Sequence, residues 1–284
     1  MSFPEKHIAI VCNPTRENSK ALKIADEISI LLSGMDISHS IFIKDWPIEW
    51  TSFTEAWICG GDGTLNYFIN KYPNLHLPVS IFKGGSGNDF HWMLYGNLTI
   101  EQQVEKLLSG TIHFVDGGTC NGKLFLNGVG IGFDGEIVKD LLGKNKLAGK
   151  ATYMLSVLKN ISVYKEKTYS VQTDKELINS DYLMISVANA SRYGGGFHVA
   201  PNAKVNDGLL DLCLIGKISP LKRIKYLPVI EKGQHLSLSF VQYLQLNKVT
   251  ITSSSKIHAH LDGEYIYSDI FEINCLPERF RFIW

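Results

Sequence analysis

The sequence has neither a long hydrophobic segment nor a surplus of charge of one sign. Its 284 residues include 28 basic and 28 acidic side chains. This even balance argues against a nucleic-acid partner, because proteins that bind nucleic acid usually carry a basic surplus. No uncharged apolar run approaches the roughly 18 residues needed to cross a bilayer, so any membrane contact is expected to be peripheral. The N-terminal MSFPEKHIAIV has charges before its apolar run and no small-residue cleavage site, which predicts a cytoplasmic protein.

Several motifs of common enzymes and metal proteins are also missing. The five cysteines are scattered and never form a CxxC pair, so reduced thiols are expected rather than disulfides or a zinc site. No GxxxxGK segment is followed by Ser or Thr, which argues against a P-loop enzyme; the nearest, residues 117–123, continues with Leu124. GGSGN at residues 84–88 misses GxSxG by one position, which argues against a hydrolase nucleophile at Ser86.

Hydrophobic residues make up 45% of the chain, which is typical of a globular protein, and the length suits two domains. In residues 1–112, strand-like apolar runs alternate with amphipathic stretches: HIAIVCNP, ALKIADEISILLSG, SIFIKDW, EAWIC with NYFINKY, LPVSIF with FHWML, and TIEQQVEKLLSG. Alternating strands and helices predict a parallel sheet. We therefore expect a Rossmann-like α/β nucleotide-binding domain here.

From residue 113 to 275 the pattern changes to strand-like pieces and glycine turns, such as KLFLNGVGIGF, DYLMISVANA and KVTITSS. One helical stretch, about residues 147–161, interrupts them. This pattern predicts a mainly antiparallel, β-sandwich-like domain. The last residues, 276–284, could return as a strand to complete the first domain.

The most informative segment is GGDGTLN at residues 60–66, which follows the apolar run AWIC. Three glycines in four positions permit positive φ and leave no Cβ to hold a phosphate away from backbone N–H groups. Asp62 could hold a metal ion or its water, and Thr64 could bond a phosphate oxygen or cap the following helix. By itself the segment could also be an ordinary glycine turn with a helix cap.

A second glycine segment, GGSGND at residues 84–89, follows the next apolar run, VSIF. Ser86 offers a hydroxyl, Asn88 an amide and Asp89 a carboxylate. Glycine loops at the ends of adjacent strands of one sheet would frame a single crevice, where α/β proteins bind phosphates.

Several segments in order make the chain resemble the diacylglycerol kinase catalytic-domain family, bacterial lipid kinases related to sphingosine and ceramide kinases. They are Asn13-Pro14, GGDGTLN, GGSGNDF, VDGG around Asp116, FLNGVGIGFDGEI at 125–137, GGGFHVAPNAKVNDGLLDL at 194–212 and DGE at 262–264. The resemblance covers nearly the whole chain. It implies an ATP-binding α/β domain joined to a β-rich domain that receives the lipid, with the active site in the cleft between them.

The resemblance also assigns roles to individual residues. The implied ATP contacts are Asn13, Gly60, Gly61, Asp62, Gly63, Thr64, Leu65, Asn66, Gly85, Ser86 and Asn88. Asp62, Asp89 and Asp116 would place or hold the catalytic Mg²⁺, and Glu264 would be the general base that takes the proton from the lipid hydroxyl. A structural Mg²⁺ site would use the Asp207 carboxylate and the main-chain carbonyls of Lys204 and Leu209.

These roles agree with the chemistry of phosphoryl transfer, which needs charge neutralisation, an oriented hydroxyl and in-line geometry rather than a protein nucleophile. Some positions depart from the family pattern: Thr15 and Arg16 replace the usual small residue and glycine after Asn13-Pro14, Ser86 a usual threonine, Asn206 a frequent aspartate and His91 a small residue. None of these changes removes an expected catalytic group.

Two further features lie toward the lipid end of the chain. Lysines surround the helical stretch, at 144, 146, 150, 159, 165 and 167, and a second basic cluster contains Lys217, Lys222, Arg223 and Lys225. Either could rest on an anionic membrane, and either could be a solvated face. His258 and His260 alternate on an expected strand with no third ligand at useful spacing, which indicates structural roles. Tyr193, beside GGG, could line the cleft.

The sequence therefore favours an ATP- and Mg²⁺-dependent lipid kinase that phosphorylates diacylglycerol or a similar lipid alcohol, peripheral to the inner membrane face. NAD kinases and sugar-phosphate kinases share a GGDG-type loop, but they leave GGSGND, the VNDGLLD segment and DGE unexplained. A nucleotide-binding regulatory protein without turnover is the other alternative. The presence of Asp62, Asp89 and Glu264 counts against it.

Overall fold

The structure, a computed structural model, describes residues 6–12, 20–143 and 149–284, without the side chains of 149–152. The chain divides into two compact units, Met1–Val115 with Glu278–Trp284, and Asp116–Pro277. The boundaries expected from the sequence lie at residues 112 and 275. Asn13, an expected ATP contact, and two of the lysines expected near the membrane, Lys144 and Lys146, lie outside the described residues.

The first unit contains the predicted parallel sheet. Its strand order is β4-β3-β1-β2, and all three pairings are parallel. The strands are β1 (His7–Cys12), β2 (Ser38–Phe42), β3 (Glu55–Gly60) and β4 (Val79–Lys83). Strand β3 is buried along its whole length, as expected for a central parallel strand covered on both faces. The end of β13 (Glu264–Ile283) returns to this sheet, where Phe282 pairs with Val79 in parallel.

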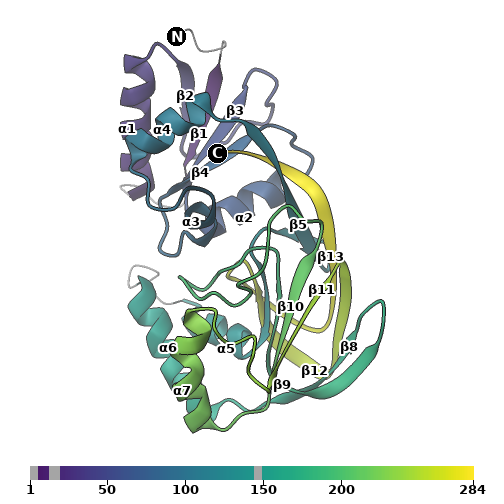
Figure 1. The fold of residues 1–284 in the computed structure, drawn as a ribbon. Helices are drawn as coiled ribbons and strands as arrows, with labels where there is room; N and C mark the ends of the chain where they lie inside the picture. The colour runs from purple at the N-terminus through teal and green to yellow at the C-terminus, as the bar shows by residue number, and fades with distance from the viewer. Residues whose placement is uncertain (1–5, 13–19, 144–148) are drawn as a thin grey trace. The chain divides into compact units, whose positions relative to one another are not determined.

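Four helices connect and cover these strands: α1 (Lys20–Gly34), α2 (Asp62–Lys71), α3 (Asp89–Tyr95) and α4 (Ile100–Ser109). Helix α1 buries the predicted apolar stripe, including Ile24, Ile28 and Leu32, and lies beside α4 (Figure 1). A capping box between Thr99 and Gln102 begins α4, since both side chains satisfy backbone N–H groups that a helix start leaves unpaired.

The second unit is built around antiparallel strands. They are β5 (Ile112–Cys120), which begins in the first unit, β6 (Lys123–Phe125), β7 (Gly128–Gly132), β8 (Lys167–Gln172), β9 (Leu177–Ala188), β10 (Leu210–Gly216), β11 (Val241–Leu246), β12 (Lys248–Leu261) and most of β13. Strands β7 and β8 each pair with both β9 and β12, so these four strands close into a ring of pairings. The predicted layout, a mixed α/β part followed by a β-rich part, is confirmed.

The second unit also holds three helices in its described part, where the sequence predicts one. They are α5 (Phe133–Leu141), α6 (Gly149–Val163) and α7 (Pro220–Glu231). Helix α6 is the expected one. The prediction missed α5 because an Asp-Gly pair near its start reads as a turn, and it missed α7 because Pro228 interrupts that helix. All three gather on one side of the sheet (Figure 1).

Successive side chains along the strands point to opposite faces of the sheet, and they contribute to two separate apolar clusters in this unit. On β10, Leu210, Leu212 and Leu214 face a cluster enclosed by the strands. Cys213 and Ile215 face the opposite cluster, which contains side chains of α5 and α6. Both faces of this strand are therefore buried, and the space between the sheet and the helices becomes the place to look for a ligand pocket.

Candidate active site

In the first unit, the two glycine segments contact each other through their backbones. GGDGTLN joins β3 to α2 and GGSGND joins β4 to α3, so they follow adjacent parallel strands. A Cβ placed on Gly61 would lie 2.7 Å from Gly85 Cα, and one placed on Gly85 would lie 2.5 Å from Gly61 Cα. These distances leave no room for a side chain at either position. The structure therefore brings together the two loops that the sequence assigns to phosphate binding.

Asp62 fastens the start of α3 to the first loop. Its Oδ2 accepts the N–H of Asp89 at 3.0 Å, and its Oδ1 accepts the N–H of Phe90 at 2.9 Å. A Cβ on Gly87 would lie 3.1 Å from Asp62 Oδ2 and 3.4 Å from Asp89 Oδ2, so Gly87 passes between the two carboxylates. Asp62 thus has a structural role that the sequence analysis did not foresee.

The remaining polar residues of the loops divide into anchors and exposed groups. Asn88, in the left-handed region at φ 57°, accepts the N–H of Gly85 through Oδ1 at 2.8 Å and donates through Nδ2 to Gly85 O at 2.9 Å. The Thr64 side chain is buried against Gly60. Of Asn88, Thr64 and Ser86, only Ser86 is exposed.

His91, which follows GGSGNDF where the family usually has a small residue, is buried in α3. Its Nε2 lies 2.9 Å from Gln103 Oε1, and the Gln103 amide donates to Ile81 O. Burial lowers the pKa of His91, which favours the neutral ring. The histidine therefore ties α3 to α4 and the sheet, away from the loop residues.

In the second unit, Asp116 joins the turn expected to hold the structural metal. Its N–H donates to Val205 O at 2.6 Å, and its Oδ2 accepts the N–H of Gly208 at 2.7 Å. Gly208 has φ 73°. Asp207, exposed in the same turn, accepts the N–H of Leu209 at 3.1 Å. Asp116, expected at the catalytic metal, thus lies beside the Lys204–Leu209 turn.

The DGE turn is held by its aspartate and presents its glutamate. Asp262, at φ 50°, accepts the N–H groups of Leu126, Asn127 and Gly128 at 2.8 to 2.9 Å. Three such bonds fix a carboxylate firmly in a buried position. Glu264, two residues later, begins β13 with its side chain exposed. The aspartate of the motif therefore acts as an anchor for the turn that carries the expected base.

The carboxylates expected to bind Mg²⁺ belong to both units. Asp62 and Asp89 lie together in the first, and Asp116 lies in the second. No group of three or more His, Cys, Asp or Glu side chains gathers within the part of the chain that the structure describes. Carboxylates and main-chain carbonyls are nevertheless the hard oxygen donors that Mg²⁺ prefers. The donor chemistry fits the ion.

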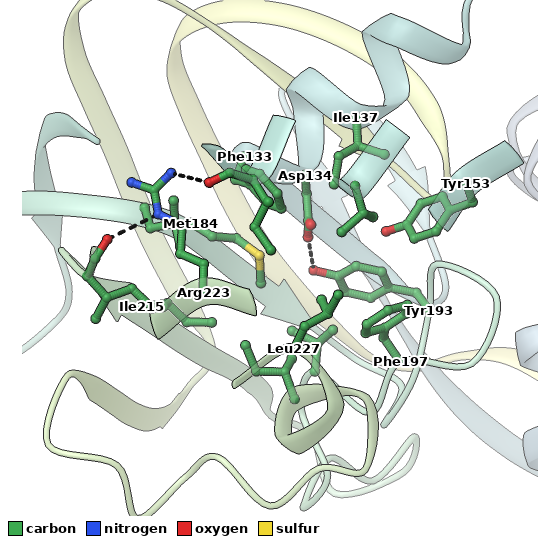
Figure 2. A pocket seen from close by; sticks show the side chains of 16 residues that line it. Phe133, Asp134, Ile137, Tyr153, Met184, Tyr193, Phe197, Ile215, Arg223 and Leu227 are labelled. Atoms are coloured by element: carbon green, nitrogen blue, oxygen red, sulfur yellow. Dashed lines mark hydrogen bonds between the residues drawn. The ribbon is translucent and has the colours of Figure 1, made fainter. Parts of the chain in front are cut away.

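The second unit contains an apolar pocket between its sheet and its three helices (Figure 2). Its cavity volume, measured for the centres of water-sized spheres, is about 50 Å³, and the empty space including open solvent is about 580 Å³. Its walls come mainly from aliphatic and aromatic side chains of α5, α6, α7, β9 and β10, together with the segment around Tyr193: Phe133, Ile137, Tyr153, Val157, Ile161, Leu183, Met184, Phe197, Val199, Ile215, Ile218, Leu227 and Ile230. A pocket with these walls suits a hydrocarbon chain.

Polar side chains, among them Tyr193, Asp134 and Arg223, interrupt the apolar wall. Tyr193 donates its hydroxyl to Asp134 Oδ2 at 2.7 Å, as Figure 2 shows. Burial, with Asp134 close by, raises the pKa of Tyr193 well above its usual value, so the phenol keeps its proton. Arg223 is held by carbonyls of Ile161, Tyr164 and Ile218 and by the Glu166 carboxylate. Among the described residues that line the pocket, Asp134 is the only acid.

Neither this pocket nor Asp134 was predicted from the sequence. Tyr193 was expected as a residue that could line a cleft, and it lies in the wall of the pocket within the second unit. The sequence held one signal for Asp134. An aspartate directly after the apolar run GVGIGF would be buried, and acidic residues are rarely buried unless they are paired. His258 and His260 lie on one face of β12, as expected from their alternation.

Comparison with known proteins identifies relatives over both units. Residues 7–120 match the family described as the diacylglycerol kinase catalytic domain, and residues 127–284 match the family described as the YegS C-terminal NAD kinase beta sandwich-like domain. A diacylglycerol kinase of Bacillus subtilis is 27% identical over 210 residues, covering 72% of this chain and 69% of that protein. A diacylglycerol kinase of Mycobacterium tuberculosis is 27% identical over 221 residues, covering 75% and 68%.

A solved structure shares the fold. The crystal structure of a diacylglycerol kinase from Bacillus anthracis str. Sterne matches with a TM-score of 0.78 and 21% identity, covering 100% of this chain and 98% of that one. At this identity the likeness concerns the fold alone.

Proposed function

The chain belongs to the family described as the YegS C-terminal NAD kinase beta sandwich-like domain and also matches the diacylglycerol kinase catalytic domain over residues 7–120, and we propose that it transfers the γ-phosphate of ATP to a hydroxyl group of diacylglycerol or a similar lipid alcohol. The observation that carries this proposal is the apolar pocket of the second unit. NAD and sugar phosphates have no hydrocarbon chain to match its aliphatic walls, whereas an acyl chain would fill them. The paired glycine loops of the first unit supply backbone N–H groups of the kind that bind phosphates.

In the proposed reaction, the loops at residues 60–66 and 84–88 hold the phosphates of ATP, and the pocket of the second unit holds the acyl chain of the lipid. Mg²⁺, when bound, would neutralise phosphate charge, with Asp62, Asp89 and Asp116 as its holders. The lipid hydroxyl oxygen forms a bond to the γ-phosphorus while the bond to the bridging oxygen breaks and ADP leaves. Glu264 takes the hydroxyl proton. Mg²⁺ at the Lys204–Leu209 turn would be structural, through Asp207.

Transfer of labelled γ-phosphate from ATP by the purified protein tests the proposal. We expect labelled lipid from a panel of diacylglycerols and other lipid alcohols, and none from NAD or a sugar phosphate. Label on NAD or the sugar would favour the related soluble kinases. ATP binding without transfer to any acceptor would favour a regulatory protein that lacks turnover.

Filling the pocket should weaken lipid use without affecting ATP. Leu227 lines the pocket from α7, so Leu227→Trp would occupy space that an acyl chain needs. We expect the KM for a long-chain lipid to rise by about tenfold or more, because displaced methylenes each carry about 0.8 kcal/mol of burial free energy. The KM for ATP should stay unchanged. A lipid KM equal to that of the wild type in a folded variant would exclude this pocket as the acyl site.

We also propose that the protein meets the cytoplasmic face of an anionic membrane through the outer surfaces of α6 and α7. No described helix is both long and apolar enough to span a bilayer. On α6, Leu155 and Leu158 are exposed, and on α7 Leu221 is 80% and Ile224 49% exposed. The inward faces of the same helices line the pocket. A membrane covering the outer faces would therefore lie against the same helices that line the pocket.

Charge on α7 supports an anionic surface as the partner. Lys222 and Lys225 are exposed between the apolar residues of α7, and each lysine near an anionic bilayer contributes about 1 kcal/mol of attraction. Arg223, which the sequence grouped with them, is buried and hydrogen-bonded inside the unit. Arg223 therefore belongs neither to a membrane contact nor to a solvated face, the two alternatives that the sequence left open, because its guanidinium binds carbonyls of neighbouring segments.

Removing the exposed apolar residues of α7 should release the protein from vesicles. We expect the double variant Leu221→Ser, Ile224→Ser to bind vesicles of phosphatidylglycerol and phosphatidylcholine at least about tenfold more weakly, since each large aliphatic side chain contributes about 1.5–3 kcal/mol when buried. Ile48→Ser, which removes a 94% exposed side chain from the first unit, is the matched control. Turnover of a short-chain, water-soluble lipid should be unaffected. Equal vesicle binding by the double variant and the wild type would contradict the proposed surface.

A further inference from the structure

A buried polar cluster connects the wall of the apolar pocket with the DGE turn. It contains Asp134, Ser186, Tyr193 and His260, whose exposed fractions are 6%, 0%, 5% and 4%. All four lie in the second unit, on different elements. Burying polar groups of this kind destabilises the folded protein unless they hydrogen-bond one another. Their grouping beside an otherwise apolar pocket therefore suggests that they have a role in function.

The cluster is ordered around Tyr193. The tyrosine donates to Asp134 Oδ2 at 2.7 Å, and its hydroxyl oxygen lies 2.9 Å from Ser186 Oγ. Because the phenol has one proton, the serine hydroxyl is the donor in the second contact. The Tyr193 ring meets the His260 ring edge to face, with centroids 5.2 Å apart at 77°. Tyr193 thus fixes one side of His260.

His260 joins this cluster to the turn that presents Glu264. Its Nδ1 accepts the N–H of Gly263 at 3.3 Å. With Nδ1 as acceptor, the neutral ring carries its proton on Nε2, which lies 3.9 Å from Asp134 Oδ2. One imidazole therefore faces the pocket carboxylate with one nitrogen and the DGE turn with the other.

Gly130 on β7 provides the space in which these groups meet. A Cβ at this position would lie 2.4 Å from His260 Nε2 and 2.8 Å from Asp134 Oδ2. Any side chain here would push the histidine and the aspartate out of place. The GVGIG segment, so far explained only as a strand, thus has a specific reason for its second glycine.

We propose that His260 is a positioning residue for phosphate transfer: it sets the orientation of the DGE turn by holding Gly263, and it is itself held by the pocket wall through Asp134 and Tyr193. This inference rests on the proposed function, in which Glu264 is the base. Asp262 fixes one side of the turn on the backbone at residues 126–128. His260 fixes the residue between Asp262 and Glu264, so a loosened His260 moves the carboxylate relative to the lipid hydroxyl.

Two substitutions separate this role from a merely structural one. His260→Asn keeps an oxygen where Nδ1 lies and can still accept the Gly263 N–H. His260→Gln places its amide where Nε2 lies and loses that bond. His258→Asn is the matched control, because His258 lies two residues earlier on the same strand and instead contacts Tyr265 and Glu136.

We expect His260→Gln to lower kcat for the lipid by about tenfold or more, as residues that orient reacting groups usually do, with the KM for ATP unchanged. His260→Asn should restore most of kcat, and His258→Asn should match the wild type. Hydrogen exchange at the Gly263 amide should be faster in His260→Gln than in His260→Asn. An unchanged kcat in His260→Gln, or equal losses in the Asn and Gln variants with equal falls in Tm, would overturn the role of His260.

The same assays distinguish failure of the positioning role of His260 from failure of the proposed kinase function. A wild-type protein that labels no lipid refutes the kinase proposal, and the positioning role with it. A wild-type protein that labels lipid while His260→Gln does so equally well refutes only the positioning role.

Discussion

Replacing Glu264 with glutamine should lower the rate of phosphate transfer to lipid by a factor of about 10² to 10⁴, the usual contribution of a general base. Glutamine has nearly the same size and cannot take up the hydroxyl proton. The side chain is exposed at the start of β13, so the substitution should not disturb the core. ATP binding and Tm should equal those of the wild type, and the loss should appear in kcat.

Asp269→Asn provides the control for this variant, since Asp269 is another exposed acid on the same strand. It should behave as the wild type in the labelled-phosphate assay. If Glu264→Gln kept activity close to the wild type, another group would have to be the base, and the role that the family resemblance gives to DGE would be wrong.

Gly61→Ala should abolish ATP binding and transfer together. The added Cβ would lie 2.7 Å from Gly85 Cα, and backbone atoms on both loops would have to separate to accommodate it. A misplacement of about 1 Å in groups that position a substrate can cost about a hundredfold in rate. We expect at least that loss in activity and a matching fall in ATP affinity, measured by calorimetry.

The control for this substitution is Gly34→Ala. Gly34 ends α1, and a Cβ built there meets no atom within 4 Å. This variant should keep full activity. ATP affinity close to the wild-type value in Gly61→Ala would show that the contact between the two loops is not needed for binding the nucleotide.

The sequence was most informative where a structural feature depends on consecutive residues, as in the strands of the parallel sheet and the two glycine loops. Apolar runs followed by amphipathic stretches predict the parallel sheet, because each central strand is buried on both faces. The glycine segments at 60 and 84 predict loops at the ends of adjacent strands, and the pairing of β3 with β4 brings them together. The clash distances between Gly61 and Gly85 then explain why both positions lack a side chain.

The sequence was least informative where the structure depends on residues distant along the chain. The pocket is assembled from side chains between Phe133 and Ile230, and in sequence each of them looks like an ordinary core residue. Helices α5 and α7 were missed because an Asp-Gly pair and Pro228 weaken the local helical signal. Packing between sheet and helices overrides that local preference.

Two acidic residues of the motifs bind backbone N–H groups, a structural role that the motifs themselves do not indicate. Asp62 accepts the N–H groups that begin α3, and Asp262 accepts three N–H groups at residues 126–128. A carboxylate in a conspicuous motif can thus hold the backbone that presents a neighbouring group. For this reason, loss of activity on substituting Asp62 would not by itself prove metal binding, whereas the exposed Glu264 gives a cleaner test of chemistry.

The most direct test of the proposed mechanism is a crystal structure of the protein with Mg²⁺, a nonhydrolysable ATP analogue and a lipid alcohol. We predict phosphates against the loops at 60–66 and 84–88, the acyl chain in the pocket beside Asp134, and the Glu264 carboxylate about 3 Å from the lipid hydroxyl or one water away from it. A nucleotide bound elsewhere, or a Glu264 beyond reach of the hydroxyl in the loaded complex, would contradict the mechanism.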